Sequence, residues 1–239
     1  MSIDYTEQLR INGELMASAV ARDLDAHVPS CPDWNVAKLT IHTGQHHRWV
    51  ADAIRRGGES PERPGKPGLR GDELVEWFRV CWSELADLLD ASDDESPAWS
   101  WAGDNRVGFW RRRTALETLV HRWDAENAVG ETSSLDPALS SDGVDEMLFV
   151  MAPAGGWTYK GPGARVGLAT TDAGGSWTMT LEDGKTPVVA RGSDGSPDVT
   201  FEAPAADLCL FLWGRLGSEV AKVSGDDALA DSVVRWWAE

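Results

Sequence analysis

Four segments in the first half of the chain carry apolar residues at the three- and four-residue spacing of an amphipathic helix. This spacing predicts helices over residues 5–27, 36–56, 71–91 and 110–129. Asn35 stands directly before the second segment and is a residue type that caps helix N-termini. Four helices with short to medium connections predict a helical bundle.

Beyond residue 151 the pattern changes to the two-residue period of β-strands. Apolar residues alternate over 166–170 and 177–181, and Asp183-Gly184 predicts a hairpin turn before the apolar run 187–190. A further strand is expected over 199–201, and helices over 205–216 and 227–237. The fold class is therefore α+β: a four-helix bundle over residues 1–150 and a small C-terminal α+β domain with an antiparallel sheet over 151–239.

Composition narrows the range of partners. The 239 residues include 39 acidic and 22 basic side chains, a net charge of −17, which repels nucleic-acid backbones and anionic membranes. We therefore expect neither a nucleic-acid nor a membrane partner, and the sequence has no apolar run long enough to span a bilayer. The three cysteines lie far apart, and no signal peptide is visible, which favours a cytoplasmic protein.

The candidate chemistry lies on two of the predicted helices. Glu117 and His121 are four residues apart on one helix, as are His42 and His46 on another, so each pair shares a helix face. Two such pairs on facing helices can converge on one divalent ion, and both zinc and nickel accept these ligands. Asp124 is placed to hydrogen-bond a ligand imidazole. Spacing alone leaves open a solvated Glu–His ion pair and an exposed Asp124.

Other candidates are weaker. His47 directly follows His46, so we expect its ring to lie at the surface. Cys31 precedes a predicted helix start and is either a nucleophile or a structural residue. The sequence has no nucleophile elbow, P-loop or dinucleotide-binding fingerprint.

Three motifs follow one another along the chain: Cys31-Pro32-Asp33-Trp34 leading to His42, Arg112 through Asp124-Ala125-Glu126, and Trp213-Gly214-Arg215. In this order they resemble the mycothiol-dependent maleylpyruvate isomerase family over nearly the whole chain. The resemblance implies a DinB-like metal-binding bundle, a small C-terminal domain and an actinobacterial source. Leu116 stands where the family often has histidine, at a position outside the family's metal triad.

Carried over by position, the family's metal triad is His42, Glu117 and His121, usually holding zinc, with His46 as a nearby pocket residue. The resemblance implies mycothiol as thiol cosubstrate at the open metal position. A metal-bound thiolate would add to the double bond of a maleylpyruvate-like dicarboxylate, allow rotation, and leave to give the trans product. Arg215 is expected to bind the substrate carboxylate.

The sequence leaves several alternatives open for the carboxylate-binding residue and for the function. Arg48 and Arg113 are weaker candidates for the carboxylate, and Arg215 is equally compatible with an interdomain ion pair. The same site suits a mycothiol S-transferase that acts on small electrophiles. A third reading is a non-catalytic, metal-dependent binding or regulatory module, for which His46 as a fourth ligand would close the site. The sequence permits a monomer or a homodimer.

Overall fold

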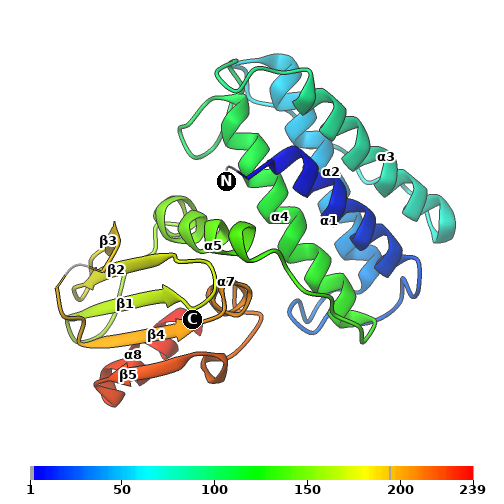
Figure 1. Ribbon diagram of the computed structural model, residues 1–239. Helices are drawn as coiled ribbons and strands as arrows, with labels where there is room; N and C mark the ends of the chain where they lie inside the picture. The colour runs from blue at the N-terminus through cyan, green and yellow to red at the C-terminus, as the bar shows by residue number, and fades with distance from the viewer. Residues whose placement is uncertain (1–2, 194, 239) are drawn as a thin grey trace. The chain divides into compact units, whose positions relative to one another are not determined.

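The computed structural model describes residues 3–193 and 195–238, and the chain divides into two compact units, Met1–Ser133 and Ser134–Glu239 (Figure 1). The first unit is built from four helices: α1 (Tyr5–Val20), α2 (Val36–Arg56), α3 (Gly71–Asp90) and α4 (Val107–Ala128). Helix α1 packs against α3 and α4, and α2 packs against the same two helices. Each helix thus has two principal neighbours, which confirms the predicted bundle.

Local hydrogen bonds fix both the end of α1 and the start of α2. Helix α1 ends at Val20, so the prediction of a helix continuing to residue 27 is wrong. The backbone N–H of Asp25 donates to the Asp23 carboxylate, a local turn that competes with helical hydrogen bonds. The side chain of Asn35 accepts a hydrogen bond from the backbone N–H of Lys38 at 3.0 Å, which confirms the predicted cap of α2.

Helix α2 buries a broader stripe than its apolar residues alone suggest. The buried positions include Val36, Leu39, Thr43, Gly44, His47 and Val50. Gly44 is in such close contact with Trp77 of α3 that an added Cβ would stand 2.4 Å from the indole. Because α3 and α4 both press on α2, its buried stripe is broad and includes polar residues. His42 and His46 lie at the edge of this stripe.

The second unit begins with helical segments and continues into a sheet. Its elements are α5 (Pro137–Glu146), η1 (Met147–Met151), α6 (Ala152–Ala154), β1 (Ala164–Thr170), β2 (Ser176–Leu181), β3 (Val188–Arg191), β4 (Val199–Ala203), α7 (Ala205–Leu212), η2 (Ser218–Val220), β5 (Lys222–Gly225) and α8 (Asp227–Ala238). Val144, Met147 and Leu148 belong to the same apolar core as the sheet. For this reason α5, which the sequence pattern grouped with the first 150 residues, lies within the second compact unit.

The five-stranded sheet has the order β3-β2-β1-β4-β5. The pairs β1–β2, β2–β3 and β4–β5 are antiparallel, whereas β1 and β4 run parallel, so the sheet is mixed and not wholly antiparallel. The chain leaves β3 at one side of the sheet and returns on the far side of β1, which gives β4 the direction of β1. The predicted α+β class is confirmed, and β5 is a strand that the sequence pattern did not reveal.

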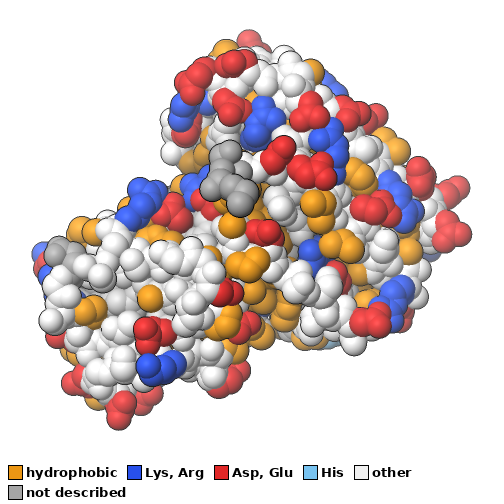
Figure 2. All heavy atoms as spheres, viewed as in Figure 1, with side chains coloured by type: hydrophobic (Ala, Val, Ile, Leu, Met, Phe, Trp, Pro, Cys, Tyr) orange, Lys and Arg blue, Asp and Glu red, His pale blue; other side chains and the backbone are white. Residues whose placement is uncertain are grey.

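The surface and the helices agree with the composition. Acidic and basic side chains are interspersed over the face shown in Figure 2. In the described part of the chain, none of the helices combines the length and the apolar character needed to cross a membrane.

Candidate metal centre

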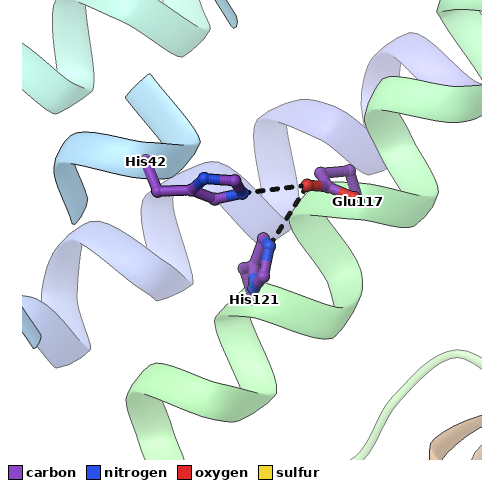
Figure 3. Close-up of side chains that lie close together, drawn as sticks. All are labelled: His42, Glu117 and His121. Carbon is purple, nitrogen blue, oxygen red and sulfur yellow. Dashed lines mark hydrogen bonds and ion pairs between the residues drawn. The ribbon is translucent and has the colours of Figure 1, made fainter. Parts of the chain in front are cut away.

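Two facing helices of the first unit bring three potential ligands together. His42 comes from α2, and Glu117 and His121 come from consecutive turns of α4 (Figure 3). One ligand atom from each of the three lies within 4.8 Å of the other two. Glu117 Oε1 is 3.4 Å from His42 Nε2 and 3.1 Å from His121 Nε2. The carboxylate oxygen therefore faces both imidazoles, at the point where α2 packs on α4.

The three side chains differ in their exposure to solvent. The side chain of His42 is 44% exposed, while those of Glu117 and His121 are only 13% and 9% exposed. The cluster is therefore embedded in the bundle on the α4 side and accessible on the α2 side. Two imidazole nitrogens and one carboxylate oxygen are ligands that a borderline divalent cation accepts.

A buried carboxylate orients the His121 ring. Asp124 is fully buried, and its Oδ2 lies 2.9 Å from His121 Nδ1. Its other oxygen, Oδ1, accepts a hydrogen bond from the Ser30 hydroxyl at 2.5 Å. A carboxylate at Nδ1 favours the proton on that nitrogen, so the lone pair on Nε2 faces Glu117. Asp124 is thus a supporting residue of the site and not an exposed helix carboxylate.

A buried arginine holds the second oxygen of Glu117. Arg113 lies one turn earlier on α4, and its Nη2 forms an ion pair with Glu117 Oε2. The Arg113 side chain is only 4% exposed, so the pair is shielded from water. The guanidinium stabilises the ionised carboxylate and leaves Oε1 directed toward the imidazoles. This ion pair gives Arg113 a role other than the substrate contact considered for it from the sequence.

The electrostatics keep His42 in the form that binds metal. Burial, together with the nearby His121 and Arg113, lowers the pKa of His42 to about 4. At neutral pH the imidazole is therefore uncharged, and a neutral imidazole is the metal-binding form.

Two family models together match most of the chain. The family model described as "Mycothiol maleylpyruvate isomerase N-terminal domain" matches residues 6–126, and the one described as "MDMPI C-terminal domain" matches residues 138–232. The chain belongs to the mycothiol maleylpyruvate isomerase family. The predicted resemblance is thereby confirmed, and together the two matches cover both compact units.

Two solved structures are similar to this family member over most of its length. One, a crystal structure of the mycothiol-dependent maleylpyruvate isomerase, is 12% identical with a TM-score of 0.63, and the match covers 94% of this chain and 96% of that chain. The other, a histidine-to-alanine mutant of the mycothiol-dependent maleylpyruvate isomerase, is 11% identical with a TM-score of 0.66, covering 92% and 91%. At these identities the likeness shows the shared fold. None of the curated proteins matches the chain in sequence.

The remaining histidines of α2 lie outside the three-residue cluster. His47 is fully buried, so the prediction of a surface position is wrong. Its Nε2 lies 2.9 Å from the hydroxyl of Thr118 on α4, and its ring stacks on Phe78 of α3 at a centroid distance of 5.7 Å. His46 is half-buried and is not among the residues that converge within 4.8 Å. Packing between three helices decides these positions.

The arginines predicted from the sequence lie in different places. Arg48 is exposed on α2. Arg215 belongs to the second unit, where its Nη1 donates to the Trp213 carbonyl at 2.7 Å and its guanidinium lies 5.9 Å from the Trp213 ring centroid. Its role toward a substrate carboxylate stays a prediction.

Two supporting contacts were not anticipated from the sequence. The Arg113–Glu117 pair has the four-residue spacing of a helical ion pair, so a signal for it was present. The Ser30–Asp124 hydrogen bond joins residues 94 positions apart, and no local pattern reveals such a contact.

Proposed function

We propose that this chain is a divalent-metal-dependent enzyme that uses mycothiol to isomerise the cis double bond of a maleylpyruvate-like dicarboxylate. The observation that carries the proposal is the convergence of His42, Glu117 and His121, with Asp124 buried behind one imidazole. The family description and two similar solved structures, both named as mycothiol-dependent maleylpyruvate isomerase, support mycothiol and the substrate class.

The donor set fits a catalytic rather than a structural metal site. Catalytic zinc sites use three protein ligands and keep one position for water or substrate, whereas structural sites use four. His46 would be needed to close the site, and it is not part of the converging group among the described residues. Bound here, a divalent cation would lower the pKa of a coordinated thiol, so that the thiolate predominates at neutral pH.

The protein's own groups would hold and tune this centre. His42 and His121 offer neutral imidazole nitrogens, and Glu117 contributes the negative charge that favours a cation. Asp124 keeps the His121 proton on Nδ1, and Arg113 keeps Glu117 ionised. Each supporting contact thus maintains a protonation state that metal binding requires.

In the proposed isomerisation the thiolate adds to the substrate and leaves again, so no atoms or electrons are gained or lost. The mycothiol thiolate forms a C–S bond to one alkene carbon, and the π electrons move onto the conjugated carbonyl. Rotation occurs about the new single bond. The C–S bond then breaks, the double bond re-forms in the trans geometry, and the thiolate is released without net proton consumption. If the adduct carbon is protonated instead, the C–S bond persists, which is the S-transferase outcome.

Metal content and product identity test the proposal. Elemental mass spectrometry of the wild type should show about one divalent ion per chain, lost in His121→Ala and retained in the control His27→Ala, which alters an exposed histidine of the same unit. Proton NMR of maleylpyruvate with mycothiol should then show the trans isomer with free thiol. A stable thioether would instead favour the S-transferase. A metal-free wild type after growth in replete medium would overturn the proposal.

A further inference from the structure

A cavity of about 270 Å³ adjoins the metal centre within the first unit. It is lined by His42, Gln45, His46, Trp49, Arg63 and Pro64. His42 belongs both to this cavity and to the cluster with Glu117 and His121, so a molecule in the cavity lies beside the candidate metal ligands. The lining includes no carboxylate, although the chain contains 39 acidic residues. The local chemistry therefore favours an anionic ligand over a cationic one.

Arg63 supplies a positive charge to the cavity, and hydrogen bonds hold its loop on either side of this residue. The backbone N–H of Glu62 donates to the Asp52 carboxylate at 3.3 Å, and Gln45 Nε2 donates to the Pro64 carbonyl at 2.7 Å. Arg63 lies between these two anchors, and the following proline restricts its backbone to extended conformations. Two contacts from α2 thus hold the Arg63 backbone over the cavity.

Arg63 has no ion-pair or hydrogen-bond partner among the described residues, and its side chain is exposed. By contrast, Arg10 is paired with Asp90, and Arg106 is paired with Asp104. A guanidinium offers a planar pair of donors that suits a carboxylate. The cavity thus presents an unpaired cation of suitable geometry.

Two buried polar atoms of the lining also lack a hydrogen-bond partner within the described part of the chain. They are His46 Nε2 and the indole Nε1 of Trp49, and buried polar groups of this kind are normally satisfied by protein, water or ligand. Trp49 packs edge-on against Trp110 at a centroid distance of 5.4 Å and against Trp99 at 5.7 Å, which holds its ring in place. The indole therefore forms a fixed flat wall of the cavity.

We propose that this cavity binds the carboxylate end of an unsaturated anionic substrate, with Arg63 as the carboxylate-binding residue and Trp49 against the conjugated part. The inference rests on the proposed function for the position of the reacting double bond, which would lie toward His42. It assigns the carboxylate contact to a residue of the first unit, distinct from Arg215.

Titration calorimetry with maleate tests the assignment without requiring turnover. Arg63→Met should weaken maleate binding about tenfold, as expected for the loss of one charge-assisted contact. Lys66→Met is the matched control, because it removes one exposed positive charge from the same loop at a residue outside the cavity. It should change the affinity less than about twofold, and dimethyl maleate, which has no charge, should bind equally to the wild type and Arg63→Met.

The outcomes separate this assignment from the proposed function. Absence of maleate binding to the wild type, equal binding to the wild type and Arg63→Met, or equal losses in Arg63→Met and Lys66→Met would each overturn the role of Arg63. These results would leave the metal and mycothiol measurements intact. Conversely, Arg63-dependent maleate binding in a protein that holds no metal would support the pocket and overturn only the proposed reaction.

Discussion

The buried carboxylate of Asp124 contacts one ring nitrogen of His121, a residue of the proposed metal site. Its Oδ2 lies 2.9 Å from His121 Nδ1, and no part of its side chain is exposed. Asp124→Asn preserves the shape of the side chain and removes its charge. The neutral amide binds the Nδ1 proton less strongly, and its amino group can favour the opposite tautomer.

The expected loss of zinc affinity follows from the position of Asp124 behind His121, a ligand in the proposed site. Substitution of a residue that supports a metal-binding histidine typically costs about 10–100-fold in affinity, or roughly 1.4–2.7 kcal/mol. Full burial places Asp124 toward the upper part of this range, because water cannot replace the lost interaction. Ser30→Ala, which removes the hydrogen-bond donor to Asp124 Oδ1, should weaken the free energy of zinc binding by about 1 kcal/mol.

Competition for zinc with a chromophoric chelator at pH 7 measures these affinities. Glu126→Gln is the matched control: Glu126 is also buried on α4 and accepts hydrogen bonds from Ser133, but it is not part of the metal cluster. We expect this variant to bind zinc within about twofold of the wild type. Unchanged zinc affinity in Asp124→Asn, or an equal loss in Glu126→Gln, would refute the reasoning.

Three further predictions concern the bundle that carries the site. Burial lowers the pKa of His47 well below its usual value, so the unfolded state binds more protons than the folded state as the pH decreases below about 6.5, and the protein becomes less stable. In urea unfolding, the free energy of unfolding of His47→Gln should therefore decrease by about 1.4 kcal/mol less than that of the wild type between pH 7.5 and 5.5. An identical pH dependence in both proteins would contradict this. Gly44→Ala should destabilise by about 1–3 kcal/mol in thermal unfolding through overlap with Trp77, whereas Gly58→Ala, with open space around it, should have little effect. Asn35→Ala should cost about 1 kcal/mol by uncapping α2, with Asn35→Asp as the conservative control that keeps the stability.

Much of the helical bundle can be predicted from the sequence because the patterns that indicate its helices involve residues close together in the chain. A cap such as Asn35 and the helical spacing of Glu117 and His121 involve residues within one or two turns, and both recur in the structure. The strand segments of the second unit can also be predicted from the sequence, but the order of the strands in the sheet cannot. The parallel pairing of β1 with β4 depends on a return across the sheet that no alternation encodes.

The burial of the α2 histidines shows where local pattern fails. The apolar spacing grouped His42 and His46 on one face and left His47 at the surface. The structure buries His47 because α3 supplies Phe78 and α4 supplies Thr118 on that side. A helix with two packed neighbours has a buried stripe wider than its apolar residues indicate, so periodicity alone misplaces its polar members.

By itself, the sequence determined the helical segments, the strand-rich second half and the family, because each rests on residue types at short, regular spacing. Tertiary structure decided that Ser30 supports Asp124 and that Arg63 stands over a cavity beside His42. These contacts join loops to helices across long separations in sequence. Their energies depend on burial and distance, which arise only when the helices pack, and no local spacing records them.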